Sequence, residues 1–187
     1  MMGMEERKIF RNEYEVLRKE LDRRCQEGRK IVMASGSFDL FHLGHMRMLK
    51  AAKERGNILI VAVKSDRAAA LKKKDPPVLN EEIRMETVSN CGSVDYVILA
   101  DYDPLRQVSL KFENVSAYQW LNMFEPVLQT IQPDIFVHED NEKLVNARKV
   151  LFEKYSVQSV VQPRTEGIST TQIIDTIRTR LLQEMQE

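Results

Sequence analysis

Short apolar runs alternate with stretches of helical periodicity along most of the chain. Runs rich in β-branched residues predict five strands, at 30–34, 57–63, 94–99, 134–138 and 157–161. Between these runs, apolar residues recur every three or four positions, which predicts helices such as 46–55, 80–91 and 142–155. Strands that alternate with helices are typical of a parallel sheet covered on both faces. We therefore expect a Rossmann-like, doubly wound five-stranded α/β sheet.

An amphipathic helix is predicted ahead of this alternating region. Its apolar residues between positions 5 and 26 form one stripe, and Gly28 follows as a stop: Phe10, Tyr14, Leu17, Leu21 and Cys25. Because the polar face mixes charges of both signs, the pattern favours packing on the domain or a partner subunit over binding to a membrane surface. We expect residues 1–28 to be a helical extension and residues 29–187 to be the main domain.

Prolines and a capping pattern mark three further places. Pro76 and Pro77 follow three lysines and predict an exposed basic loop over residues 71–77. Pro126 falls inside the helix predicted around residues 120–131, where we expect a kink or a break. Residues 169–172 have the Ser-x-x-Gln form of a capping box, which predicts a last helix from there to about Gln186.

Composition narrows the class of protein. The 187 residues suffice for one α/β domain, and 28 basic residues balance 28 acidic ones. The chain therefore has no net charge that would attract nucleic acid or an anionic membrane, and any site for an anion must come from a local group of residues. The two cysteines fit a reducing compartment, and the chain shows no signal-peptide core or apolar run long enough to span a membrane. We expect a cytoplasmic protein that binds no nucleic acid.

The run GSFDLFHLGH, from Gly36 to His45, follows the first predicted strand. Residues three positions apart share one helix face, so His42 and His45 should point together above the carboxyl end of that strand. A phosphate monoester is mostly dianionic at neutral pH, so its attack on a nucleotide α-phosphorus needs hydrogen-bond donors and positive charge rather than a strong base. Zinc binding by the pair is the main competing interpretation, and it lacks further well-spaced ligands.

A second candidate anion site precedes the last predicted helix. Residues 164–171 read RTEGISTT and combine a guanidinium, a flexible glycine and three hydroxyls at a helix N-terminus. Under the alternative interpretation the hydroxyls only cap the helix.

Other charged residues have two interpretations each. The lysines at 72–74 fit a solvated patch and a loop that folds over a triphosphate equally well. Arg84 would face either the site or solvent. Asp39 and Asp140 follow strands, where a carboxylate can hold magnesium, a ribose hydroxyl or a substrate ammonium.

Together these motifs resemble the cytidylyltransferase family, which includes the glycerol-3-phosphate, choline-phosphate and ethanolamine-phosphate enzymes. The GSFDLFHLGH run marks the wider nucleotidyltransferase superfamily, and RTEGISTT is closer to its CTP-using members. Residues 74–78, 82–84, 94–95 and 136–140 are similar to further family motifs. The match covers roughly residues 30 to 180.

The resemblance implies roles for individual residues. His42 and His45 would hold the triphosphate and stabilise the transition state, and Lys74 and Arg164 would neutralise phosphates. Thr170 is expected to act with them. The nucleotide site would be lined by residues of both motifs and one strand end: Gly36, Ser37, Phe38, Asp39, Asp140, Thr165, Gly167, Ile168, Ser169 and Thr171. Magnesium bound to the triphosphate and a homodimer are further implications.

Three residues and one segment depart from the family pattern. Asp75 replaces a usual glycine, Gly92 a usual arginine or lysine, and Tyr96 a usual glutamate, while residues 103–126 form a longer stretch. The main hypothesis is in-line transfer of a cytidylyl group from CTP to a small phosphorylated alcohol, such as ethanolamine, choline or glycerol phosphate, with release of pyrophosphate. The alternatives are adenylyl transfer to a sugar phosphate or cofactor precursor, and a non-catalytic nucleotide-binding regulatory protein of the same fold.

Overall fold

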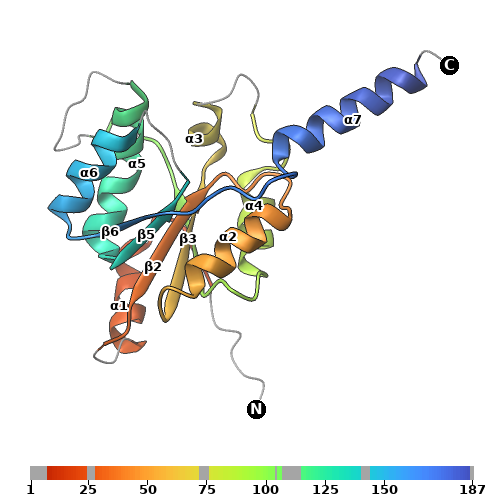
Figure 1. Ribbon diagram of the computed structural model, residues 1–187. Coiled ribbons are helices and arrows are strands. Elements are labelled where there is room, and N and C mark those ends of the chain that lie inside the picture. The colour runs from red at the N-terminus through yellow and green to blue at the C-terminus, as the bar shows by residue number, and fades with distance from the viewer. Residues whose placement is uncertain are drawn as a thin grey trace.

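Six parallel strands form one sheet in the computed structural model, which describes residues 8–24, 28–71, 76–103, 105–106, 115–139 and 144–185. The spatial order is β1-β4-β3-β2-β5-β6 (Figure 1). The strands are β1 (Ile9–Phe10), β2 (Ile31–Gly36), β3 (Ile58–Lys64), β4 (Tyr96–Ala100), β5 (Ile135–His138) and β6 (Gln158–Val161). The predicted doubly wound parallel sheet is confirmed, with six strands instead of five.

Helices cover both faces of the sheet (Figure 1). One face carries α1 (Tyr14–Arg24), α5 (Val115–Ile131) and α6 (Val145–Lys154), and the other carries α2 (Leu43–Lys53) and α4 (Glu81–Ser89). The short α3 (Asp66–Ala70) follows β3, and α7 (Thr170–Glu184) projects away from the body (Figure 1). Alternate β3 residues enter the two core clusters, as expected for a strand buried on both sides.

The N-terminal segment differs from the prediction. The helix begins at Tyr14, and Ile9 and Phe10 instead form the edge strand β1, where Ile9 pairs with Val97 of β4. A strand of two residues is too short to show an alternating pattern, so periodicity does not reveal it. Leu17 and Leu21 are completely buried in the cluster that also contains α5. The apolar stripe therefore packs on the domain, one of the two placements that the sequence favours.

Helix α5 runs without interruption through Pro126, where the sequence predicts a kink or a break. Proline has no N–H for the carbonyl of residue 122, four positions earlier. That carbonyl instead accepts a hydrogen bond of 2.8 Å from Nη1 of Arg106. The Asn122 side chain also bonds both backbone groups of Asp103, at 3.0 and 2.7 Å. A distant arginine thus satisfies the carbonyl that the proline leaves unpaired, which local sequence rules do not reveal.

Candidate functional site

His42 and His45 cap the start of α2, directly beyond the carboxyl end of β2. Nδ1 of His42 accepts a hydrogen bond of 3.1 Å from the Gly44 amide, and Nδ1 of His45 accepts one of 3.4 Å from the His42 amide. This is a reciprocal capping box in which two imidazoles replace the usual hydroxyl and carboxylate. The two rings stack with their centroids 3.8 Å apart. The sequence therefore fixes both side chains through the helix start itself.

These hydrogen bonds also set the protonation of the pair. Because each Nδ1 accepts, each neutral ring carries its proton on Nε2. Burial, together with the neighbouring His42, lowers the pKa of His45 to about 4, and burial lowers the pKa of His42 as well. At pH 7 both rings are thus neutral, each with an Nε2–H donor, and both residues line the surrounding cavity. Either ring gains a full charge only when an anion raises its pKa.

Gly44 has a packing role between the two histidines. A Cβ at this position would lie 2.9 Å from Cε1 and 3.0 Å from Nδ1 of His42. The glycine therefore makes room for the imidazole of His42.

Asp39 organises the loop after β2. Its side chain is almost completely buried, and it accepts bonds of 2.9 to 3.1 Å from the amides of Val78, Leu79 and Leu40. The residues on either side of it, Phe38 and Leu40, have φ values of 54° and 45°, in the strained left-handed region. The carboxylate that the sequence assigns to nucleotide binding is thus engaged in holding this loop to residues 78–79.

The sequence predicts that Arg84 faces either the site or solvent, but its side chain is buried and does not line the cavity. Its guanidinium is completely buried and donates to the carbonyls of Leu79 at 2.9 Å, Lys64 at 2.8 Å, and Ser37. It also forms an ion pair of 2.7 Å with Asp66. Arg84 therefore joins the ends of β2 and β3 to the loop that precedes α4, and it supports the site from beneath.

The RTEGISTT segment meets the histidine motif in space. The Thr170 hydroxyl donates to the carbonyl of Asp39 at 2.8 Å, and Ser169 caps α7 by accepting from the Gln172 amide at 3.2 Å. A Cβ on Gly44 would lie 3.5 Å from the Ile168 side chain. Residues more than 120 positions apart in sequence therefore share one surface, as the sequence hypothesis requires.

Arg164 and Gly167 differ in detail from expectation. The Arg164 guanidinium is about three-quarters exposed and forms an ion pair of 2.7 Å with Glu139, so a carboxylate partly balances its charge. Gly167 adopts a φ of 77°, which favours glycine at this turn.

A cavity of about 460 Å³ lies between these elements at the carboxyl edge of the sheet. That volume falls in the usual range for small-molecule sites. Most of the predicted residues line it: Gly36, Ser37, Phe38, Asp39, His42, His45, Arg164, Thr165, Ile168, Ser169, Thr170 and Thr171. Gly167 is not among the lining residues, and Lys74 and Asp140 lie outside the described residues.

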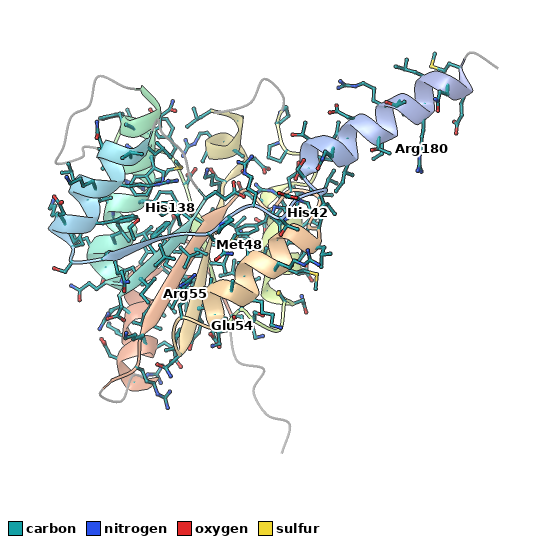
Figure 2. The ribbon with its side chains drawn as sticks, viewed as in Figure 1. His42, Met48, Glu54, Arg55, His138 and Arg180 are labelled. Atoms are coloured by element: carbon teal, nitrogen blue, oxygen red, sulfur yellow. The ribbon has the colours of Figure 1, made fainter. Side chains whose placement is uncertain are left out.

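The cavity extends to residues that the sequence analysis did not place in the site. These are Ser35, Lys64, Trp120, His138, Leu144 and Arg148, among others. Figure 2 shows His138 and His42 near the same end of the sheet, with Arg180 far out on α7. Lys64 and His138 end parallel strands, and that position was a signal available in the sequence. Trp120 and Arg148 lie on α5 and α6, and only the packing of those helices brings them here.

One end of the cavity is held by a polar cluster around His138. Nη1 of Arg148 donates to Nδ1 of His138 at 2.8 Å and to the Glu139 carbonyl at 3.0 Å. Nδ1 of His138 also lies 2.9 Å from the Glu139 carbonyl, and Nε2 lies 2.8 Å from the Ser159 hydroxyl. The Arg148 guanidinium also lies 5.9 Å from the ring centroid of Trp120. These contacts fix a cation beside an aromatic ring.

Metal-binding clusters and membrane spans are both absent from the described part of the chain. No group of three or more histidine, cysteine, aspartate or glutamate side chains there could hold a metal ion. No helix there is both long enough and apolar enough to cross a membrane.

The cavity lies beyond the ends of β2, β3 and β5, where open α/β proteins with a parallel sheet usually bind their ligands, so the chain has the fold and site position of that class. Comparison with known proteins identifies the family within this class. Residues 33–176 match the family model described as cytidylyltransferase-like, and the chain belongs to that family. The family resemblance in the sequence motifs is thereby confirmed.

Similar proteins give a second view of the chain. It is 30% identical over 167 residues to the bifunctional protein HldE of a Nitratiruptor species, covering 89% of this chain and 31% of that protein. HldE of Gluconobacter oxydans (strain 621H) is 33% identical over 154 residues, covering 80% of this chain and 28% of that protein. The chain thus spans less than a third of the length of these curated relatives.

Solved structures show the same architecture. A lipopolysaccharide core biosynthesis protein from Thermoplasma volcanium GSS1 has a TM-score of 0.54 and 26% identity, covering 74% of this chain and all of that one. Pantoate-beta-alanine ligase from Francisella tularensis has a TM-score of 0.60 and 14% identity, covering 86% of this chain and 68% of that one. The second likeness concerns the fold alone.

Proposed function

We propose that the protein transfers a nucleotidyl group from a nucleoside triphosphate to a phosphate monoester. An oxygen of the acceptor phosphate attacks the α-phosphorus, the bond from the α-phosphorus to its bridging oxygen breaks, and pyrophosphate leaves. The observation that carries the proposal is the meeting of the two imidazole donors and the start of α7 in one cavity. Both supply N–H groups to oxygens on which negative charge builds up in the transition state.

Each part of the site has a role in this reaction. Nε2–H of His42 and His45 would donate to the phosphate oxygens and gain positive charge as the anion raises their pKa. The proposal also includes the contacts expected from the sequence, which are those of Arg164 and Lys74 with phosphates and of Asp140 with the nucleotide. Lys74 and Asp140 lie outside the described residues. The cavity carboxylates Asp39 and Glu139 are already engaged by amides and by Arg164. We therefore expect Mg²⁺ to enter with the triphosphate, whose oxygens supply its ligands.

We place adenylyl transfer to a sugar phosphate ahead of cytidylyl transfer to a phosphorylated alcohol. The relatives named above are bifunctional HldE proteins, and none is named as a cytidylyltransferase of choline, ethanolamine or glycerol phosphate. A structural relative is named as a lipopolysaccharide core biosynthesis protein, and that name points to sugar chemistry more than to a phosphorylated alcohol. Asp75, Gly92 and Tyr96 also depart from the pattern of the phospho-alcohol enzymes.

A matrix of donors and acceptors tests the proposal. The purified protein is incubated with Mg²⁺, ATP or CTP, and a panel of sugar phosphates and phosphorylated alcohols, and pyrophosphate and products are measured by coupled assay and mass spectrometry. We expect pyrophosphate and an ADP-sugar. A CDP-alcohol from CTP would restore the main hypothesis of the sequence analysis. Nucleotide-dependent thermal stabilisation without pyrophosphate release would instead identify a non-catalytic binding protein, and no effect of either nucleotide would reject the proposal.

The expected homodimer is a separate prediction. Light scattering after size-exclusion chromatography measures it directly, and a mass near 21.8 kDa would contradict it.

A further inference from the structure

Lys64 is the last residue of β3, and it lines the cavity. Side chains alternate between the two faces of a strand. The alternate residues before Lys64 all belong to the core cluster beneath α1, α5 and α6: Ile58, Ile60 and Ala62. Lys64 therefore leaves the strand on the face covered by α5 and α6. It lies across the sheet edge from α2, whose Leu49 and Ala52 pack on the opposite face.

Two neighbouring strands place polar side chains on the same face. Ser35 follows Met33 in the alternation of β2, and His138 follows Phe136 in that of β5, and both line the cavity. In the sheet order, β3 and β5 lie on opposite sides of β2. A row of polar side chains thus crosses three strand ends, with Lys64 at its β3 end and His138 at its β5 end.

Positive charge in the described part of the cavity is divided between the two sides. Besides the two imidazoles, whose pKa burial lowers, the basic side chains that line the described part of the cavity are Lys64, Arg148 and Arg164. The two arginines both lie on the β5–β6 side, where one pairs with the Glu139 carboxylate and the other donates to the Glu139 carbonyl. Lys64 is the basic lining residue on the β3 side of the described cavity.

In-line displacement at the α-phosphorus places the attacking oxygen and the leaving pyrophosphate on opposite sides of that atom. The two substrates must therefore approach the central imidazoles from different directions. We propose that Lys64 binds the phosphate of the acceptor, an inference that rests on the proposed function, and that the donor nucleotide lies toward β5 and β6. The acceptor class is accordingly a dianionic phosphate monoester that enters from the β3 side.

The support beneath Lys64 suits this role. Its carbonyl accepts a 2.8 Å bond from Nη2 of Arg84, whose other nitrogens hold the Ser37 and Leu79 carbonyls. The backbone of Lys64 is thereby fixed relative to the loop that leads to the histidines.

Thermal unfolding with two defined ligands tests Lys64. Inorganic phosphate is titrated onto the full chain with and without a saturating α,β-methylene analogue of ATP or CTP, which occupies the donor site without reacting. For the wild type we expect phosphate to raise the melting temperature beyond the effect of the analogue. Lys64→Met, which keeps the apolar stem, should keep the rise caused by the analogue and weaken phosphate binding by about tenfold or more. Lys64→Gln should give the same result, so that a folding defect in one of the two variants does not decide the test.

Lys50→Met is the matched control, because Lys50 is an exposed lysine of α2 outside the cavity lining. It should keep both effects. Retained phosphate binding in both Lys64 variants, or no phosphate binding in the wild type, would overturn the inference. Loss of the rise caused by the analogue would place Lys64 with the donor and also overturn it. If the analogue fails to stabilise the wild type, the proposed function is rejected. Phosphate binding that still depends on Lys64 would then identify an anion site that does not serve nucleotidyl transfer.

Discussion

The starts of α2 and α7 face the same cavity, yet the two helices are anchored in different ways. Helix α2 buries Leu49 and Ala52 in the core, and the capping imidazole of His45 packs against Phe38 and stacks on that of His42. Helix α7 has no buried residue, and its first turn is attached through Thr170 to the Asp39 carbonyl. Both helices thus begin with capped amides, but the start of α2 belongs to the rigid core, whereas the start of α7 lies at the edge of that core. This difference separates changes that unfold the protein from changes that act only on the site.

The largest expected effect is on the rigid side. Arg84→Met would leave the Asp66 carboxylate and three backbone carbonyls without their buried donor. We expect the free energy of unfolding to fall by about 3 to 5 kcal/mol, measured by urea denaturation. Arg180→Met, an exposed change on α7, should alter it by less than about 0.5 kcal/mol. Equal effects of the two variants would contradict the contrast between the helices.

Variants of His45 separate its capping role from its donor role. The amide oxygen of asparagine can replace Nδ1, and the amide nitrogen of glutamine can replace Nε2–H. His45→Asn should therefore keep the bond to the His42 amide but slow pyrophosphate release by about 100- to 1,000-fold, the usual effect of losing one transition-state donor. His45→Gln should also keep the bond to the His42 amide, because glutamine is a usual residue at this position of a capping box, and its amide N–H should retain more activity than asparagine does. The opposite ranking would assign the ring to structure alone.

Gly44→Ala tests the packing of the two rings. The added Cβ would approach Cε1 of His42 to 2.9 Å, so the ring must move. We expect a loss of about 1 to 3 kcal/mol in stability and a lower rate of pyrophosphate release. At Gly92 a Cβ meets nothing within 4 Å, so Gly92→Ala should have little effect on either measurement. A neutral Gly44→Ala would show that the imidazole of His42 is not fixed by its neighbours.

The pH dependence of stability follows from the pKa of His45. Its folded value of about 4 lies below the usual 6.5, so the unfolded chain binds more protons between these values. The contribution is complete above pH 6.5 and is lost as the pH falls toward 4. After allowing for the partial exposure of the ring, we expect about 1 to 2 kcal/mol, measured as the difference between wild type and His45→Asn in denaturant titrations across that range. Parallel curves for the two proteins would contradict the assignment.

The sequence predicts the buried sheet and the start of α2 better than it predicts the contacts at the edge of the core, where α7 begins. Periodicity locates the buried strands and the start of α2, because local apolar patterns report directly on burial. It misses β1, which is too short to show a pattern. It also predicts a kink or a break at Pro126, where the helix continues and Arg106 satisfies the Asn122 carbonyl from outside the helix. In the site, both motifs are visible as strings of residues. The engagement of Asp39, Arg84 and Arg164 by other protein groups depends on contacts between distant segments, which spacing does not encode.

The smallest expected effect compares one cap on each kind of helix. Asn80 caps α4, which buries Met85 and Val88, and Ser169 caps α7, which buries nothing. Asn80→Ala should lower the global free energy of unfolding by about 1 kcal/mol, because the core cannot form without α4. Ser169→Ala weakens α7 by a similar local amount, but α7 can fray while the sheet stays folded. We therefore expect almost no change in global unfolding and faster hydrogen exchange confined to the first turns of α7. A global loss equal to that of Asn80→Ala would mean that α7 is anchored as firmly as the helices of the core.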